Sequence, residues 1–184
     1  FIESTKIKGL FLIEPDIFGD NRGHFFETYV SKKFNEAGIT ANFVQDNQSF
    51  SAQVGTLRGL HCQAGESAQA KLVRVLRGSI FDVAVDVRPC SPTYGQWEAY
   101  TLSGDNKHQL FIPRGFLHGF MSLTPDVEML YKCDGLYDKA SERGVTWNDT
   151  QIGIAWPLQV EPVLSEKDTS LPTFADYQKE FPNA

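Results

Sequence analysis

The stretch "KLVRVLRGSIFDVAVDVR", residues 71–88, is the part of the sequence that most directly decides the fold class. Two strand-like runs flank Arg77 and Gly78, a pair typical of a turn. In the second run, apolar residues at 81, 83, 85 and 87 alternate with residues 80, 82, 84 and 86. A period of two residues predicts a β-strand with one wholly apolar face and one face that carries two carboxylates, Asp82 and Asp86.

Similar short runs, separated by Gly, Pro, Asn and Asp, continue along the chain in both directions. Further strands are expected at residues 9–14, 24–29, 43–49, 56–63, 96–102, 109–112, 119–123 and 127–133. Helix signals are few: residues 31–38, with Ser31 as the expected N-cap and Gly38 as the stop, and a short segment near residues 174–181. Many short strands with little helix predict an all-β sandwich or barrel, jelly rolls included, and the pattern alone does not select the topology.

Length and charge narrow the class of protein. The 184 residues suit one domain spanning residues 1–184, and the net charge of −6 argues against a broad nucleic-acid or anionic-membrane surface. No apolar run approaches the length of a membrane span, and the first residues lack the features of a secretory signal. Cys62, Cys90 and Cys133 are odd in number and far apart, which favours thiols in a reducing cytoplasm over disulfides or a zinc knuckle.

Two histidines stand in unusual surroundings, in "LRGLHCQ" at residues 57–63 and in "IPRGFLHGF" at residues 112–120. His61 lacks the partner spacing of a metal site, because residue 63 is Gln63 and the chain has no HxH, HxxxH or HExxH motif. A lone histidine is usually a hydrogen-bonded core residue. Arg58 and Lys71 nearby make the set too polar for a dry core, since buried charges are expensive, and a wet pocket is the better interpretation.

Several other polar segments have a plain structural explanation when each is taken alone. "LSEKDTSLP", residues 164–172, carries Lys167 and Asp168 and has the composition of a solvated loop. "YKCDGLYDKASERG" carries Tyr131, Tyr137 and Glu142, where a strand tyrosine usually packs with its hydroxyl at the surface. "DNRGHFFE", residues 20–27, is typical of a turn that enters a strand.

Taken together, these segments resemble the dTDP-4-dehydrorhamnose 3,5-epimerase family of nucleotide-sugar epimerases. The matching motifs run in order across nearly the whole chain: "DNRGHFFETY", "FVQDNQS", "GTLRGLHCQ", "AQAKLVRVLRGSIFDVAVDVR", "SPTYGQW", "FIPRGFLHGF", "YKCDGLY", "ERGVTWND", "IAWP" and "LSEKD". The resemblance implies a cupin-type jelly-roll barrel with a few short peripheral helices. It also implies a homodimer with exchanged N-terminal strands, a dTDP-sugar substrate, and no metal or organic cofactor.

The resemblance also implies roles for particular residues. His61 matches the general base, Asp168 its carboxylate partner, Tyr131 the acid on the other face of the sugar, and Lys71 the cation near the C4 oxygen. The remaining matches are substrate contacts, with the first two contributed across the dimer: Arg22, Glu27, Gln45, Asn47, Arg58, His118, Glu142 and Lys167. The family commonly has an aromatic or aliphatic residue where Cys62 stands.

The expected reaction is inversion at C3 and C5 of dTDP-4-dehydro-6-deoxy-D-glucose, which gives dTDP-4-dehydro-L-rhamnose. A C4 ketone acidifies both C–H bonds, and an imidazole with a pKa of about 6.5 suits the base. Three alternatives remain open: an epimerase that acts at C3 or C5 only, a non-catalytic sugar-binding barrel, and a metal-dependent cupin. The first shares the same catalytic set, whereas the last needs about three converging ligands.

Overall fold

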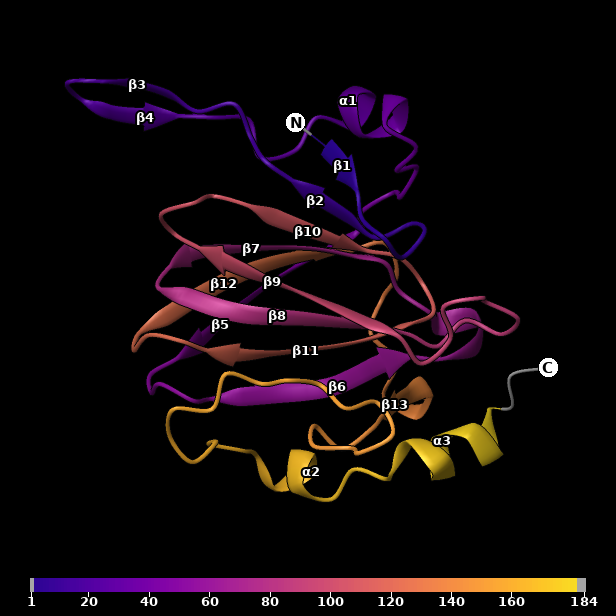
Figure 1. Cartoon of the computed structure of the whole chain (residues 1–184). Coiled ribbons are helices and arrows are strands. Elements are labelled where there is room, and N and C mark those ends of the chain that lie inside the picture. The colour runs from indigo at the N-terminus through magenta and orange to yellow at the C-terminus, as the bar shows by residue number, and fades with distance from the viewer. Residues whose placement is uncertain (1, 182–184) are drawn as a thin grey trace.

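The computed structural model describes residues 2–181 and places most of the strands in two facing sheets (Figure 1). The first sheet has the strand order β1-β2-β10-β7-β12-β5, and the second has the order β13-β6-β11-β8-β9. The bounds of the first sheet are β1 Ile2–Ser4, β2 Phe11–Ile13, β10 Gln109–Ile112, β7 Lys71–Arg77, β12 Val127–Cys133 and β5 Gln45–Ser51. Those of the second are β13 Glu142–Gly144, β6 Leu57–Gln63, β11 Phe116–Ser122, β8 Ser79–Asp86 and β9 Trp97–Ser103.

The predicted turn at Arg77 and Gly78 is confirmed, and it joins the two sheets. β7 lies in the first sheet and β8 in the second, so the chain changes sheet at this corner. Gly78 has a φ of +77°, and a Cβ there would lie 2.6 Å from the side-chain oxygen of Thr124. Only glycine combines this backbone conformation with so close an approach. The corner helps to close the sheets into the jelly-roll barrel that the resemblance implied.

The inner faces of the sheets form the main core. Its fully buried residues come from both sheets and from the turn that follows β1: Ile7, Leu10, Val73, Val75, Ile80, Ala84, Leu102, Leu110, Ile112, Phe116, Phe120, Val127 and Met129. The predicted face of β8 that carries carboxylates therefore points into the barrel. Asp82 and Asp86 have no exposed surface at all.

Most predicted strands are confirmed with shifted ends. The strand expected at 24–29 is only β4, Gly23–Phe25, which pairs with β3, Phe18–Asp20, and the strand expected at 119–123 begins earlier, at Phe116. Helix α1, Ser31–Glu36, starts one residue early, so Val30 rather than Ser31 occupies the N-cap. Helix α3, Phe174–Glu180, is confirmed, while α2, Glu166–Thr169, replaces the expected loop. The 3₁₀ turns η1, Gly65–Ser67, and η2, Lys139–Ser141, complete the described elements.

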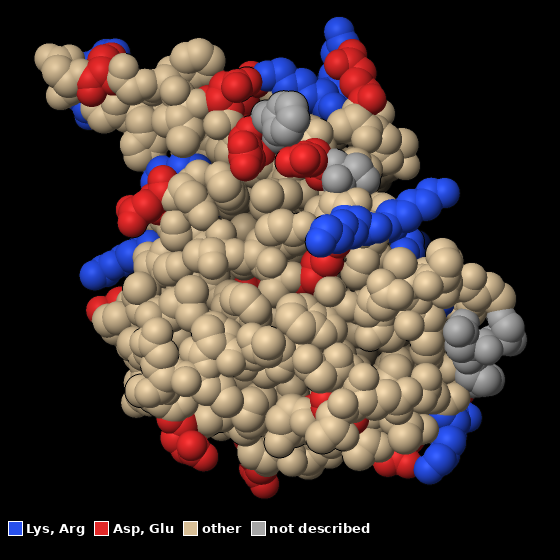
Figure 2. All heavy atoms as spheres, viewed as in Figure 1, with Lys and Arg blue, Asp and Glu red and all other residues tan. Residues whose placement is uncertain are grey.

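The β3–β4 hairpin projects from the barrel as an arm, drawn at the upper left of Figure 1. Its side chains are exposed, including Phe18 at 66% and Phe25 at 67%. Figure 2 shows charged side chains around the rim and the arm, with the broad central face of the barrel in this view nearly free of them. Among residues 2–181, no helix is both long enough and apolar enough to cross a membrane.

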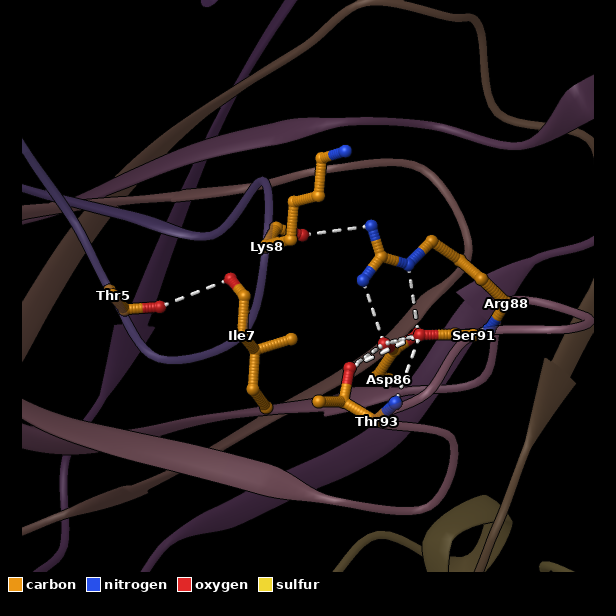
Figure 3. A network of polar contacts seen from close by, with 7 residues as sticks. All are labelled: Thr5, Ile7, Lys8, Asp86, Arg88, Ser91 and Thr93. Atoms are coloured by element: carbon orange, nitrogen blue, oxygen red, sulfur yellow. Dashed lines mark hydrogen bonds and ion pairs between the residues drawn. The ribbon is translucent and has the colours of Figure 1, made fainter.

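An ion pair with a buried carboxylate connects the end of β8 to the turn between β1 and β2 (Figure 3). Asp86 accepts hydrogen bonds from the guanidinium of Arg88 at 2.9 and 2.7 Å, and from Ser91 and Thr93 at 2.6 Å each. Arg88 also donates to the carbonyl oxygen of Lys8 at 2.8 Å. The carboxylate is thus fully paired, which is what a buried charge requires.

Candidate active site

A pocket of about 330 Å³ opens between the two sheets and collects most of the predicted site residues. We call it the central pocket. It is lined by Ser49, Arg58, His61, Lys71, His118, Phe120, Met129, Tyr131, Ser165, Lys167 and Asp168. β6 and β11 of one sheet supply the two histidines, while β7 and β12 of the other supply Lys71 and Tyr131. Side chains from facing sheets therefore reach the same space.

Two glycines let the histidine-bearing strands come close together. A Cβ on Gly59 would lie 2.6 Å from the Cα of Gly119, and Gly59 has a φ of +118°. A Cβ on Gly119 would meet the carbonyl oxygen of Arg58 at 2.9 Å. In the resulting pairing of β6 with β11, His61 and His118 are directly opposite, and the register shifts immediately afterwards. The "RGLH" and "LHGF" motifs thus place the two histidines side by side on adjacent strands of one sheet.

Asp168 lies behind His61, as the resemblance implied. Its Oδ1 is 2.7 Å from Nε2 of His61, a close polar contact between the carboxylate and the imidazole. Ser165 donates to Oδ2 at 2.6 Å, and the backbone N–H of Gly59 donates to Oδ1 at 3.4 Å. Burial raises the pKa of Asp168, but its contacts with His61 and Ser165 more than offset this, so the pKa lies below its ordinary value.

Lys71 and Tyr131 approach the pocket from the sheet opposite His61. Loss of solvent around the side chain lowers the pKa of Lys71, because burial disfavours the charged ammonium. Burial is also the main cause that raises the pKa of Tyr131, so its phenol stays protonated well above neutral pH. A protonated phenol can act as an acid.

A second ionic cluster closes the side of the pocket next to His61. Lys167 forms a close ion pair with Glu142 on β13, and the hydroxyl of Tyr137 donates to the same carboxylate at 3.1 Å. Burial raises the pKa of Glu142, and the bonds from Lys167 and Tyr137 outweigh it, so that pKa is lowered. Glu142 does not line the central pocket itself; it lines an adjoining hollow that also contains His61 and Lys167.

Of the other predicted substrate contacts, Arg58 lines the central pocket, whereas Gln45 and Asn47 do not. Arg58 lines the central pocket and donates to the carbonyl oxygen of Phe50 at 3.1 Å. Gln45 and Asn47 lie outside its lining on β5, where Gln45 donates to Asn47 at 2.9 Å. Asn47 is nevertheless paired directly with Tyr131 across β5 and β12.

Arg22 and Glu27 are not brought to the central pocket of their own chain. Arg22 is on the arm, with its side chain 84% exposed and paired with Asp20. Glu27 follows the arm and pairs with Lys33 at 2.6 Å. The arm extends away from the barrel in Figure 1, and Arg22 and Glu27 are not among the residues that line the central pocket.

Three polar residues of the pocket region were missed from the sequence. Asp82 bonds His118, Ser165 bonds Asp168, and Ser49 lines the pocket beside Met129. Ser165 had a readable signal, because Ser-x-x-Asp is a capping motif that predicts a helix start at "SEKD". For Asp82, the only indication in the sequence was its position among apolar neighbours. For Ser49, nothing in the sequence indicated a place in the pocket.

No three His, Cys, Asp or Glu side chains converge within residues 2–181 in the way a metal site needs. The architecture and the pocket define a class: a cupin-type jelly-roll enzyme whose polar residues sit between the two sheets. The family model for dTDP-4-dehydrorhamnose 3,5-epimerase matches residues 4–176. The chain belongs to this family and is an epimerase.

Individual relatives agree over nearly the full length. The chain is 52% identical over 171 residues to the dTDP-4-dehydrorhamnose 3,5-epimerase of Pseudomonas aeruginosa, covering 92% of this chain and 93% of the relative. It is 51% identical over 169 residues to that of Salmonella typhimurium, covering 91% and 92%. The crystal structure of the Legionella pneumophila 3,5-epimerase in complex with dTDP-4-keto-L-rhamnose has a TM-score of 0.93 and 47% identity, covering 98% and 95%.

Proposed function

We propose that this epimerase inverts both C3 and C5 of dTDP-4-dehydro-6-deoxy-D-glucose through an enolate, using His61 as base and Tyr131 as acid. The observation that carries the proposal is that these two side chains line one pocket but come from facing sheets. A base and an acid on opposite sides of a sugar ring turn proton exchange into inversion. The relatives named as 3,5-epimerases support the substrate.

The first step is removal of a proton. The other ring nitrogen of His61 takes the proton from C5, and the C–H electron pair moves into the ring to form an enolate with its charge on the C4 oxygen. Asp168 holds the imidazole in one orientation and stabilises the imidazolium that forms. Such a carboxylate partner improves the base without itself taking the proton.

Lys71 supplies the positive charge where the enolate oxygen develops. Its ammonium lies in a largely desolvated part of the pocket, where a charge interacts more strongly than it does in water. Stabilising charge that appears only in the transition state is usually the largest contribution to catalysis of this kind. Lys71 is therefore the residue that makes the C–H bond acidic enough for a histidine base.

The second step returns a proton from the opposite side. Tyr131 gives its phenolic proton to C5, the enolate collapses to the ketone, and the centre is inverted. The same two groups then act at C3 once His61 has lost its proton to solvent and Tyr131 has regained one. The reaction has no net redox change, so the proposal needs no organic cofactor.

The nucleotide contacts complete the proposal. Arg58 lies at the pocket, and a guanidinium is well suited to phosphate oxygens. Arg22 and Glu27 would contribute from the arm of a second subunit, since they lie outside their own pocket. We therefore infer a homodimer in which each arm contacts the partner's site, with the exposed Phe18 and Phe25 covered by that contact.

Inversion at a single carbon is the main competing function. The structure of ChmJ, a 3'-monoepimerase from Streptomyces bikiniensis in complex with dTDP-quinovose, has a TM-score of 0.89 and 35% identity, covering 96% of this chain and 89% of that one. The higher identity to 3,5-epimerases favours the double inversion. The number of carbons that exchange protons separates the two functions.

The test is to incubate the protein with dTDP-4-keto-6-deoxyglucose in heavy water and to follow deuterium at each sugar carbon by NMR. Exchange at C3 and C5 is expected for the wild type, and exchange at one carbon alone would indicate the monofunctional alternative. His61→Asn should abolish exchange, while His108→Asn, a histidine outside the central pocket, should not. Near-normal exchange in His61→Asn rules out the proposed base.

A further inference from the structure

The two carboxylates of β8 are equally buried but differently paired. Asp82 and Asp86 both have zero exposed surface, and they are four residues apart on the same face of the strand. Asp86 has its full set of partners in Arg88, Ser91 and Thr93. That network explains why a charge is tolerated at Asp86, and it gives no explanation for Asp82.

Asp82 has one hydrogen-bond partner for two oxygens. Its Oδ1 lies 2.7 Å from Nε2 of His118, whereas its Oδ2 is buried with no partner. A buried carboxylate without a complete set of bonds is costly, and replacing such ionic pairs by apolar residues often leaves stability unchanged or raises it. Stability alone therefore does not account for an aspartate here.

Lys71 lines the central pocket together with His118, whose ring contacts Asp82. The groups that act electrostatically on the pKa of Lys71 include Cys133 on β12, Cys62 on β6, Asp82 on β8 and Glu142 on β13. Burial raises the pKa of both thiols, so they are neutral and add little charge.

Of the two carboxylates that remain, Glu142 is already engaged by Lys167 and Tyr137. Asp82 is bonded only through Oδ1, to the imidazole of His118, which shares the central pocket with Lys71. It is therefore the carboxylate most available to balance that ammonium.

We propose that Asp82 is a positioning residue of the central pocket, an inference that rests on the proposed function. Its Oδ1 fixes the ring of His118, and its negative charge balances the ammonium of Lys71 inside the barrel. Asp82 does not touch the sugar. It acts on the reaction through the two side chains that do.

Two substitutions separate these two effects. Asp82→Asn keeps the side-chain shape and an oxygen that can accept from His118, but it removes the charge. Asp82→Leu removes both the charge and the acceptor while filling a similar volume. Asp86→Asn is the matched control, because it removes an equally buried carboxylate of β8 whose partners lie outside the central pocket.

The measurement is the pH dependence of epimerisation, followed by NMR, with circular dichroism to confirm folding. Activity that needs an ammonium is lost as pH rises through its pKa, and a nearby negative charge raises that pKa. In Asp82→Asn the alkaline limb of kcat should therefore move to lower pH by about one unit, a tenfold loss above the limb, with KM nearly unchanged. Asp82→Leu should show the same move together with a raised KM, because the ring of His118 is released.

Asp86→Asn should melt at a lower temperature and keep the wild-type alkaline limb. The inference is overturned if wild type epimerises and the alkaline limb of Asp82→Asn coincides with that of wild type. Should the asparagine variant fail to fold, the leucine variant provides the same comparison of the limb. A wild-type protein that exchanges no sugar proton would instead overturn the proposed function.

Discussion

Each imidazole of the central pocket has a carboxylate of its own. His61 is 2.7 Å from Asp168, and His118 is 2.7 Å from Asp82, on adjacent strands of the same sheet. The two pairs differ in access to solvent, because the side chain of His61 is 23% exposed and that of His118 only 8%. A group that exchanges protons with substrate and water has to be reachable, so His61 is better placed as the base and His118 as a contact.

Tyr131→Phe tests the acid. The raised pKa of Tyr131 keeps its proton available at neutral pH, and phenylalanine keeps the ring but has no proton to give. Inversion should fall by about a hundredfold while deuterium exchange at C5 persists, since the base is intact. Tyr137→Phe, which alters an exposed hydroxyl bonded to Glu142, should change the rate much less. Full-rate inversion in Tyr131→Phe would shift the role to another group, with Tyr137 first in line.

Asp168→Asn tests whether the charge of Asp168 stabilises the folded protein. The folded pKa of Asp168 is lowered, so its charge stabilises the protein above the unfolded pKa of about 3.9 and loses that effect as pH falls through the folded value. The variant should be less stable than wild type by about 2 kcal/mol at neutral pH. The difference should shrink as the pH is lowered from about 5 toward the folded pKa. Urea unfolding of both proteins at pH 7, 5 and 3.5 measures it, and a constant difference contradicts the assignment.

At the scale of the elements, the sequence predicted the strands whose signal is a local alternation of residues. β6, β10 and β12 were predicted within a residue because their runs are bounded by clear turn residues. The beginning of β11 was missed because glycine weakens a strand pattern, and here Gly119 is needed for close contact with β6. The pairing of Asp82 with His118 could not be predicted, because it depends on how two strands pack beside each other and not on either run alone.

Ser165→Ala tests whether the cap of α2 serves the site as well as the helix. Ser165 accepts from the backbone N–H of Asp168 at 3.1 Å and donates to its carboxylate at 2.6 Å. Thr173 makes the same two bonds with Asp176 at the start of α3, outside the central pocket. Each alanine variant should lose about 1 kcal/mol of stability. Only Ser165→Ala should also lower kcat and raise the pKa of Asp168; equal activity in the two variants would show that the cap is purely structural.

At the scale of the whole molecule, the exposed β3–β4 arm has no evident function within a single chain. Ile17, directly before the arm, and Phe18 and Phe25, at the two ends of the arm, have exposed fractions of 46%, 66% and 67%. An isolated two-stranded hairpin is only marginally stable in water, so an arm with exposed aromatic residues indicates a binding surface. A homodimer in which the arm reaches the partner's pocket would cover these residues and bring Arg22 to the nucleotide.

Mixed dimers test that arrangement directly. Arg22→Ala removes the arm's proposed contact with the nucleotide, and His61→Asn removes the proposed base. Neither homodimer should therefore turn over substrate normally. If the arm acts across the dimer, a mixed dimer has one complete site: its His61 comes from the first variant and its Arg22 from the second. Equal mixing after unfolding and refolding should then restore about a quarter of the wild-type activity, because half of the dimers are mixed and each has one working site. If the arm serves its own subunit, no site is complete and the mixture stays as inactive as its components.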